Sequence, residues 1–404
     1  MRILIITAGS RGDVAPFTGL GRRLLDAGHQ VAVAAHPSFA TLVGGCGLDY
    51  RSVPGDPQGL IRDWARAASR EEAQALTRAY ADGLADGVAQ AVAGGADLLL
   101  TAFGPAPLSR TVGEALGVPV IGTYLAPSFA TSQFPLPNAR NTDGLGPQGN
   151  LAAGRDVVRR AEGVFAGAVT RLRARLGLAA GASSAPVDVR PVFHGFSPLV
   201  VPRPEDWPSW VEVVGYWWPV RPQGWQPPAE LVDFLQAGPP PVFIGFGSMA
   251  VGQGERLSEL VTAAVERAGV RAVVQAGWAD LSGRGDDVLA VGDVPHDWLF
   301  PRAAAVVHHA GAGTTAAGLR AGVPAVPVPV MADQPFWASR LHQLGVAPRP
   351  LPFQDLTADT LGDAITACLS EPAHRHRAAE LARGIAAEDG TASLLAHIGS
   401  QGAG

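Results

Sequence analysis

Two glycine-rich turns in this sequence carry side chains that are suited to binding a phosphate and to moving a proton. The first, HHAGAGTT, runs from His308 to Thr315; an apolar run typical of a buried strand precedes it, and a helical pattern from Thr314 to Arg320 follows. The first N–H groups of a helix are unpaired and carry partial positive charge, so a phosphate or diphosphate fits there. The hydroxyls of Thr314 and Thr315 and the ring of His309 would add donors to that site.

The same residues also fit a plainer interpretation, in which the glycines of HHAGAGTT only allow a tight turn from strand to helix. The spacing favours phosphate binding without excluding that alternative. His308 is interpreted as a histidine of the core or as a support for the phosphate site.

The second turn, GSRGDV from Gly9 to Val14, holds the same position between a strand and a helix near the start of the chain. A dinucleotide site is disfavoured because GxGxxG is absent and the next strand, VAVAAH, ends without a carboxylate for a ribose. The turn instead presents Ser10, Arg11 and Asp13. Asp13 is either a cap for the following helix or a general base at a binding cleft, and both interpretations stay open.

Several other chemistries lack the residues that they require. No Asp-x-Asp is present and no group of His, Cys and carboxylates has metal-ligand spacing, so no metal cofactor is expected. A Gly-x-Ser-x-Gly elbow is also missing, which argues against a serine hydrolase. Cys46 and Cys368 are far apart and have no CxxC spacing, so they are expected to be buried thiols.

Short apolar strands that alternate with longer helical patterns position these turns. The alternation restarts near Pro241, which predicts two mostly parallel sheets with helices on both faces. The expected strands are 2–6, 30–34, 97–100, 118–121, 242–246, 271–275, 288–291 and 304–307, with a helix over 14–27. The predicted fold class is α/β, with two doubly wound, Rossmann-like domains that face each other across a cleft. In such sheets ligands bind beyond the carboxyl ends of the strands.

A segment dense in Pro and Trp, residues 198–228, separates the two patterns and is interpreted as the connection between domains. The expected organisation is a first domain over 1–205, a linker over 206–228, a second domain over 229–385, and a final helix within 386–404 that packs back on the first domain. Residues 126–150 are rich in Pro, Asn, Gly and Ser, and they are expected to form a long surface loop of the kind that is usually functional or mobile.

The composition is that of a globular protein and disfavours several partners. Of 404 residues, 47% are hydrophobic and 17% are charged, so the chain has enough apolar material for packed cores. The formal net charge is −5 and no basic run is present, which disfavours nucleic-acid binding. No apolar stretch approaches the ~20 residues that span a bilayer and no signal-peptide pattern follows Met1, so a cytosolic location is expected.

Five segments, taken together, resemble one known family. They are GSRGDV, FHGFSPLVVPRPEDWPSWVEVVGYW (193–217), PPVFIGFGSM (240–249), QAGWADL (275–281) and the stretch over 295–337 that contains HHAGAGTT. In this order they resemble the sterol 3-beta-glucosyltransferases and the bacterial glycosyltransferases that decorate glycopeptide and polyketide antibiotics. Both are family 1 glycosyltransferases of the GT-B fold, and the resemblance spans nearly the whole chain.

The resemblance implies a role for each matching residue. Asp13 would be the catalytic base that takes the proton of the acceptor hydroxyl, with Ser10 and Arg11 beside the donor phosphates. The other implied donor-binding residues are Gly247 and Ser248 along the site, Trp278 and Val294 at the nucleotide base, His309, Gly311, Gly313, Thr314 and Thr315 at the diphosphate, and Asp333 and Gln334 at the sugar hydroxyls.

The sequence departs from the family at two places. Ala310 stands where the family usually has Gly, and MAD (331–333) precedes Gln334 where the sterol enzymes tend to have FGD. The second departure leaves the sugar open. The chain also lacks the N-terminal membrane-targeting regions of the eukaryotic sterol enzymes, so a sterol acceptor does not follow from the resemblance.

The implied function is inverting, metal-independent O-glycosyl transfer. A hexose would move from a UDP- or TDP-sugar, the co-substrate, to a hydroxyl of a hydrophobic polycyclic acceptor that is sterol-like, a terpenoid or a polyketide. The acceptor pocket is expected in the first domain, with Trp64, Phe129, Phe134 and Leu136 as its apolar lining. Two alternatives stay open, a nucleotide-sugar epimerase on the same fold and a catalytically silent homologue that acts as a partner of another transferase. The sequence leaves the oligomeric state open.

Overall fold

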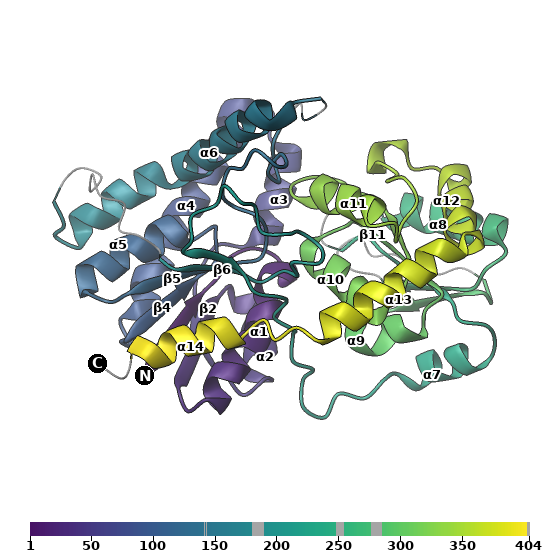
Figure 1. The fold of residues 1–404 in the computed structure, drawn as a ribbon, viewed down its shortest axis with the longest axis horizontal. Helices are drawn as coiled ribbons and strands as arrows, with labels where there is room; N and C mark the ends of the chain where they lie inside the picture. The colour runs from purple at the N-terminus through teal and green to yellow at the C-terminus, as the bar shows by residue number, and fades with distance from the viewer. Residues whose placement is uncertain (141, 143, 180–189, 248–253, 276–284, 402–404) are drawn as a thin grey trace. The chain divides into compact units, whose positions relative to one another are not determined.

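The computed structural model describes residues 1–140, 142, 144–179, 190–247, 254–275 and 285–401. The chain forms two compact α/β units (Figure 1). The first unit comprises Met1–Pro198, Pro202–Gln223 and Asp389–Gly404, and the second comprises Leu199–Val201 and Gly224–Glu388. Each unit is built around its own parallel sheet, as the alternation of strands and helices in the sequence predicts.

The sheet of the first unit has the strand order β3-β2-β1-β4-β5-β6-β7, and neighbouring strands are parallel. Along β1, Ile3 and Ile5 enter one core cluster while Leu4 and Ile6 enter the other, because successive side chains point to opposite faces. The strands are β1 (Arg2–Ile6), β2 (Gln30–Ala35), β3 (Asp49–Ser52), β4 (Leu98–Thr101), β5 (Val120–Tyr124), β6 (Val192–His194) and β7 (Val211–Val213).

Helices cover both faces of this sheet (Figure 1). α1, α2 and α14 pack on the face of Ile3 and Ile5, and α4, α5 and α6 pack on the face of Leu4 and Ile6. The helices are α1 (Arg11–Asp26), α2 (Ala40–Gly44), α3 (Pro57–Arg66), α4 (Arg70–Val92), α5 (Ala106–Leu116), α6 (Gly146–Arg175) and α14 (Ala392–Gln401). The sheet is therefore wound on both sides, which explains its continuous apolar strands.

The second unit has a five-stranded parallel sheet of order β10-β9-β8-β11-β12. α8 and α12 pack against Val242 and Ile244 on one face, while Phe300 contacts Phe243 on the other, with ring centroids 4.9 Å apart. The strands are β8 (Val242–Gly245), β9 (Ala272–Gln275), β10 (Val288–Val291), β11 (Ala305–His308) and β12 (Ala325–Pro327). The helices are α7 (Ala229–Gln236), α8 (Gly254–Ala268), α9 (His296–Leu299), α10 (Ala312–Ala321), α11 (Gln334–Gln343), α12 (Ala358–Ser370) and α13 (Pro372–Ala386).

Both sheets reverse their strand order at one point, between β1 and β4 in the first unit and between β8 and β11 in the second. The loops leaving the carboxyl ends of two such strands diverge to opposite faces, so a crevice forms where they part. The two glycine-rich turns of the sequence follow β1 and β11, and each therefore lies at the switch point of its own sheet.

In the segment rich in Pro and Trp, Leu199–Val201 belongs to the second unit. Pro202–Gln223 belongs to the first unit and includes most of the linker expected over 206–228. It contributes β7 to the sheet, and the ring of Trp217 is 3% exposed. The indole N–H of Trp217 donates to the carbonyl of Gly390 at 2.8 Å. These tryptophans are buried at irregular spacing, which is why no period in the sequence marked them as core.

The last residues of the chain return to the first unit. Leu394 and Ile398 of α14 lie in the same core cluster as Phe17 and Leu20 of α1. The second unit is therefore inserted between two parts of the first. Strand bounds differ from the expected ones by two residues or fewer at most ends, and α6 begins at Gly146, inside the loop expected over 126–150.

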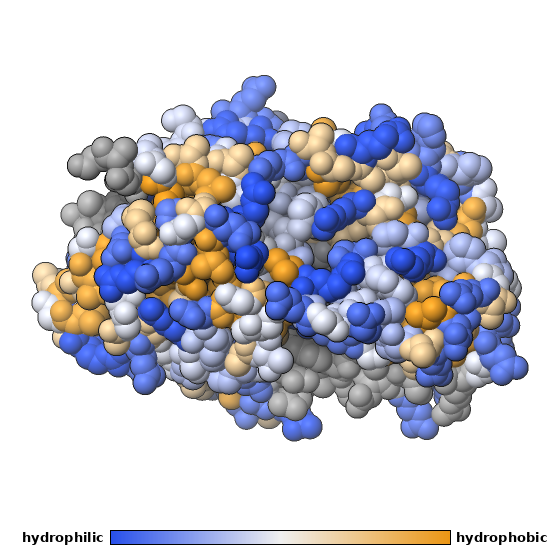
Figure 2. All heavy atoms as spheres, turned by 90° about the horizontal axis from the view of Figure 1, so that it is seen from below, coloured by the Kyte–Doolittle hydropathy of each residue, from blue (hydrophilic) through white to orange (hydrophobic). Residues whose placement is uncertain are grey.

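Polar and apolar side chains share the face that Figure 2 shows. Hydrophobic residues form several groups there, with hydrophilic residues between them, as on most folded proteins. Within the described ranges, no helix has both the length and the apolar character that crossing a membrane requires.

Candidate active site

The turn between β11 and α10 places polar groups at the carboxyl end of the second sheet. β11 ends at His308, Gly311 is the N-cap of α10, and Ala310 adopts a φ of +60°. β8 pairs with β11 so that Gly245 lies opposite His308, which brings the turn containing Gly247 alongside. The first N–H groups of α10 therefore lie at the switch point, where a helix N-terminus stabilises an anion.

The ring of His309 is held between two glycines. A Cβ atom at Gly247 would lie 2.6 Å from Cε1 of His309, and one at Gly311 would lie 2.5 Å from its Nε2, so both positions require glycine. The Nε2 edge of the ring thus lies beside the N-cap of α10. Burial lowers the pKa of His309 to about 4, so at neutral pH the ring is an uncharged group that donates one N–H.

Two side chains beneath this turn are almost completely buried. His308 is 0% exposed, and its Nδ1 accepts a hydrogen bond from the backbone N–H of Ala310 at 3.0 Å. Burial lowers the pKa of His308 to about 3, with smaller effects of His309 and His296. Thr315 is 1% exposed, and its Oγ1 has no hydrogen-bond partner among the described residues. His308 therefore supports the turn, while Thr315 keeps a free hydroxyl in the first turn of α10, where Gly313 and Thr314 are half-buried.

Asp333 and Gln334, which the resemblance assigns to the sugar hydroxyls, form hydrogen bonds that hold the loop before α11. Gln334 is 2% exposed, and its Oε1 accepts hydrogen bonds from the backbone N–H groups of Val330 at 2.8 Å and Met331 at 3.1 Å. The indole N–H of Trp337 donates to Oδ2 of Asp333 at 2.8 Å. Burial raises the pKa of Asp333. Gln334 therefore has its Nε2 to offer to a ligand, because its oxygen holds the loop.

Asp13 closes the turn at the start of α1. Ser10 is the N-cap, and Oδ2 of Asp13 accepts hydrogen bonds from its backbone N–H at 2.7 Å and from its hydroxyl at 3.0 Å. The same oxygen would lie 2.3 Å from a Cβ at Gly9, whose φ is +127°. Asp13 is half-buried at the third helical position, as in a capping box, and Arg11 is exposed at the first. The carboxylate thus has a structural role at the start of α1.

Tyr80 of α4 is a residue of this site that sequence reasoning missed. Burial raises the pKa of Tyr80 to about 12, and the nearby charges of Asp13 and Asp56 add to the shift. Its phenol therefore stays protonated and can donate a hydrogen bond near Asp13. The weak apolar periodicity of this alanine-rich helix does not show which side of the helix Tyr80 lies on, so the sequence did not single it out.

The four residues expected to line an acceptor pocket lie in different surroundings. Trp64 is 42% exposed on α3 and Phe134 is half-buried. Leu136 is 3% exposed and lies close to Gly154 of α6, and its role in an acceptor pocket stays a prediction. Phe129 contacts His194, Trp207 and Trp210 edge-on, with ring centroids 5.9, 6.0 and 5.4 Å away.

Phe129 also lines a cavity of about 680 Å³ in the first unit. The walls come from α5, from the middle of α6, from β5 and β6, and from the chain that follows β4 and β5. Ser128 at this cavity forms a 2.9 Å hydrogen bond with Nε2 of His194. His194 is 0% exposed, and burial lowers its pKa to about 3. A volume of this size accommodates a drug-sized ligand.

Two family models match the chain. The glycosyltransferase family 28 N-terminal domain matches residues 3–135, and the erythromycin biosynthesis protein CIII-like C-terminal domain matches residues 262–397. The O-mycaminosyltylonolide 6-deoxyallosyltransferase of Streptomyces fradiae is 38% identical over 405 residues, covering 96% of this chain and 95% of that protein. The chain belongs to this family of glycosyltransferases.

A plant relative of this glycosyltransferase is longer than the chain. The sterol 3-beta-glucosyltransferase UGT80A2 of Arabidopsis thaliana is 33% identical over 413 residues, covering 98% of this chain but 64% of that protein. The chain thus spans about two thirds of the plant protein and nearly all of the bacterial one.

Solved structures show the fold of the glycosyltransferase. The glycotransferase of kitacinnamycin has a TM-score of 0.72 at 21% identity, covering 99% of this chain and 98% of that one. SsfS6 of Streptomyces sp. SF2575, solved with thymidine diphosphate, has a TM-score of 0.65 at 22% identity, covering 98% of this chain and 99% of that one. The two Rossmann-like units are those of the GT-B fold.

The two departures of the glycosyltransferase from its family's usual residues share one backbone feature. Ala310 has a φ of +60° and Ala332, in the MAD sequence, has a φ of +59°. Both values lie in the left-handed region, which glycine enters without strain and alanine does not. The geometry explains why glycine is usual at both positions.

Three further donor residues implied by the resemblance are only partly accounted for. Ser248 and Trp278 lie outside the described residues. Val294 follows β10 and is 3% exposed, so its side chain is in the core and its backbone is the part left to meet a ligand. Among the residues that the structure describes, no three His, Cys, Asp or Glu are grouped to hold a metal ion.

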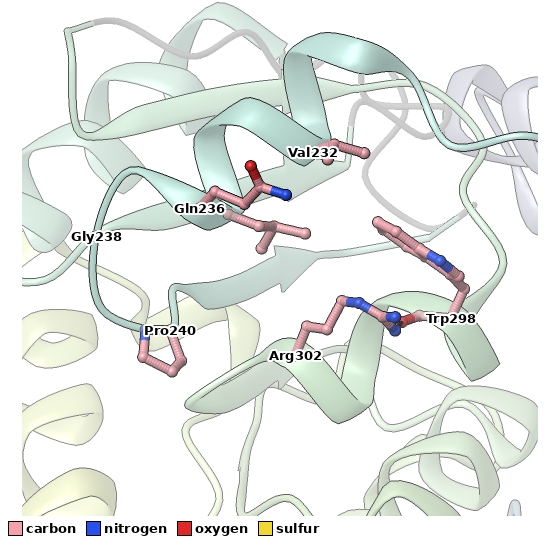
Figure 3. Close-up of a pocket in the computed structure, with 7 residues that line it drawn as sticks. Val232, Gln236, Gly238, Pro240, Trp298 and Arg302 are labelled. Atoms are coloured by element: carbon pink, nitrogen blue, oxygen red, sulfur yellow. Dashed lines mark hydrogen bonds between the residues drawn. The ribbon is translucent and has the colours of Figure 1, made fainter.

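A smaller hollow of about 340 Å³ lies elsewhere in the second unit of the glycosyltransferase (Figure 3). Trp298 and Arg302 form one side of it, with the guanidinium 4.4 Å from the ring centroid. Gly238 and Pro240 precede β8, so the hollow lies at the amino end of that strand. Ligands of such sheets bind at the carboxyl ends, so this hollow is not assigned to the donor.

Proposed function

We propose that the chain transfers a hexose from a UDP- or TDP-sugar to a hydroxyl of an apolar polycyclic acceptor, with inversion at the anomeric carbon. The observation that carries the proposal is His309, held by Gly247 and Gly311 at the N-terminus of α10. The unit that contains Gly224–Glu388 would take the donor, and the unit that contains Met1–Pro198 would take the acceptor.

On the donor side, the diphosphate would lie against the first turn of α10. Negative charge grows on the leaving diphosphate as the bond to the anomeric carbon breaks. The N–H groups of α10, the hydroxyls of Thr314 and Thr315 and the neutral ring of His309 would stabilise that charge with preorganised dipoles. SsfS6 was solved with thymidine diphosphate, which supports a nucleoside diphosphate as the leaving group.

On the acceptor side, the hydroxyl oxygen would attack the anomeric carbon from the face opposite the diphosphate. One carbon–oxygen bond forms as the other breaks, and the hydroxyl proton passes to the carboxylate of Asp13. A single displacement inverts the configuration. Asp13 is suited to this role because the Ser10 N–H and hydroxyl fix its orientation. Tyr80 would orient the carboxylate or the attacking oxygen.

Asp333 and Gln334 would hold the sugar, with Nε2 of Gln334 as a donor to a hydroxyl. An epimerase would need groups that exchange protons on both faces of the sugar. A silent partner could use Asp13 to cap α1, but it would have no need of Asp13 together with His309, Asp333 and Gln334. The retained residues of both units favour transfer over these two alternatives.

The test incubates the purified chain with UDP-glucose or TDP-glucose and a panel of polycyclic alcohols, in the presence of excess EDTA. We expect a glucoside of inverted configuration, identified by mass spectrometry and by the NMR coupling of the anomeric proton. A retained configuration, or activity that EDTA abolishes and magnesium restores, contradicts the mechanism. A changed sugar on the nucleotide would indicate an epimerase, and nucleotide binding without turnover would indicate a silent homologue.

A further inference from the structure

The cavity of about 680 Å³ in the first unit has an apolar body. Aromatic side chains form much of its wall: Phe103, Tyr124, Phe129, Phe165 and Trp210. Phe103 follows β4 and Phe129 follows β5, so part of the wall comes from the carboxyl ends of these strands, while Arg190 and Trp210 come from the amino ends of β6 and β7. β4 is the neighbour of β1, whose own carboxyl end leads into the turn of Asp13. The part of the wall that contains Phe103 and the proposed base therefore follow neighbouring strands of the first sheet.

The charged residues that line the cavity are mostly positive. They are Arg110, Arg155, Arg159, Arg190 and Glu162. The chain as a whole has a formal net charge of −5, so the charge around this cavity is opposite in sign to that of the whole chain. An apolar cavity of this kind attracts a ligand of opposite charge, and its low dielectric strengthens the attraction.

The arginines differ in how far other residues already engage them. Arg159 pairs with Asp156, and the guanidinium of Arg190 lies 4.3 Å from the ring centroid of Trp210. Arg110 and Arg155 form no hydrogen bond or ion pair with a residue that the structure describes. Arginine in an apolar surface is the residue best suited to a planar carboxylate, because it can donate two parallel N–H bonds.

The charge of Arg110 also affects the pKa of Tyr124, another residue of the cavity wall. Burial raises the pKa of Tyr124, and the positive charge of Arg110 offsets part of that shift. The charge of Arg110 therefore acts inside the aromatic wall and is not fully screened by solvent.

We propose that this cavity takes an acidic ligand, a polycyclic apolar body that carries a carboxylate or a similar anionic group paired with Arg110 and Arg155. The identification of this ligand as the glycosyl acceptor rests on the proposed function. The binding of an acidic ligand to the cavity does not depend on that function. The anionic group would fix which end of the ligand enters the cavity, and thus which hydroxyl is presented for transfer.

The test compares cholate, a steroid carboxylate with free hydroxyls, with its uncharged methyl ester, by isothermal calorimetry on the full chain. We expect cholate to bind roughly ten- to hundredfold tighter at low ionic strength, the range that a hydrogen bond to a charged group supplies. The double variant Arg110→Gln/Arg155→Gln should bind both steroids alike. Arg175→Gln, on the same helix as Arg155 but outside the cavity wall, should keep the preference.

Equal binding of acid and ester by the wild type, a preference that survives in the double variant, or no binding of either steroid overturns the proposal. Arg155 is exposed on α6, so Arg155→Gln alone is expected to fold and to lose part of the preference. Sugar transfer is measured separately, with cholate and with the panel of neutral polycyclic alcohols. Selective binding of cholate without transfer to any of them contradicts the proposed function and leaves the cavity assignment. Transfer to neutral alcohols without a preference for the acid contradicts the cavity assignment and leaves the proposed function.

Discussion

A phosphate bound by His309 and the first N–H groups of α10 would be stabilised by dipoles and neutral donors. Gly247 and Gly311 are far apart in the sequence, yet both must lack a side chain for the ring to lie between them. The sequence indicates a phosphate turn from the residues around His309. It does not reveal that a second turn fixes the ring, because that depends on the pairing of β8 with β11.

We expect Asp13→Asn to separate catalysis from structure. The amide oxygen of Asn can accept both hydrogen bonds from Ser10 that Oδ2 accepts now, so the turn should keep its shape. An amide cannot take a proton, so turnover should fall by ~10²–10⁴ while nucleotide affinity stays near native. The test measures nucleotide affinity by calorimetry and the initial rate of sugar transfer on the same preparation.

Ser10→Ala is the control for this experiment. It removes one of the two donors to Asp13 and leaves the carboxylate, so a base at position 13 should lose far less activity than in Asp13→Asn. Near-native turnover of Asp13→Asn would show that the residue only supports the helix.

The two alanines with positive φ should respond differently to substitution by glycine. Ala332 is exposed, so Ala332→Gly should relieve left-handed strain and raise the free energy of unfolding by ~0.5–1 kcal/mol. Ala310 is 0% exposed, and the buried methyl group lost in Ala310→Gly, worth ~0.8 kcal/mol, should cancel most of the gain. Calorimetric melting of both variants tests this, and a destabilised Ala332→Gly would contradict it.

The loop before α11 is an element whose behaviour depends on Gln334. Gln334→Ala should weaken sugar discrimination, but it also leaves the N–H groups of Val330 and Met331 without their acceptor, at ~1–3 kcal/mol. Gln334→Glu keeps the acceptor oxygen and replaces only the donor. We expect Gln334→Glu to lose less stability than Gln334→Ala and to change the preference between hexoses, measured as kcat/KM for several donors. The new carboxylate is buried beside Asp333, so the variant should still melt below the wild type. An unchanged preference would place the sugar elsewhere.

His308 of β11 should make the second unit less stable at low pH. The pKa of His308 is lowered by burial to about 3, so between that pH and about 6.5 the unfolded chain binds a proton that the folded unit excludes. Stability is complete above about pH 6.5 and should fall toward lower pH, by about 1.4 kcal/mol per unit for each such histidine. His308→Asn retains an acceptor for the Ala310 N–H and should reduce this slope in urea unfolding between pH 4.5 and 7.

His376 provides the matched comparison, because its ring is exposed on α13 of the same unit. His376→Asn should keep the wild-type slope. If His308→Asn keeps it as well, the acid sensitivity has another origin.

Elements with strong apolar runs could be predicted from the sequence, and those made of small residues could not. β1 and β10 have the predicted bounds because their branched apolar side chains are continuous. α4 and α6 were not assigned, since Ala81, Ala85 and Ala168 make buried contacts that hydrophobic periodicity hardly registers. Leu136 is buried near α6, a placement that its position in a polar segment of the sequence does not indicate.

On the scale of the whole molecule, the first unit should lose stability through changes at the far end of the chain. Leu394 is 0% exposed among residues of α1 and β1. Leu394→Ala should therefore lower the free energy of unfolding of the first unit by ~2–5 kcal/mol. The exposed neighbour Ser393→Ala should change it by less than ~0.5 kcal/mol. Differential scanning calorimetry with nucleotide added, to mark the second unit, identifies which transition moves.

The return of residues 389–404 to the first unit also limits how the protein can be recombined with its relatives. A chimera that exchanges the second unit needs two junctions, one near Gln223 and one near Asp389, with α14 kept from the parent that supplies α1. A single crossover would join the α14 of one parent to the core of another and leave Leu394 and Ile398 facing side chains with which they did not evolve. Exchange of the second unit to change the sugar donor therefore requires two junctions in this fold.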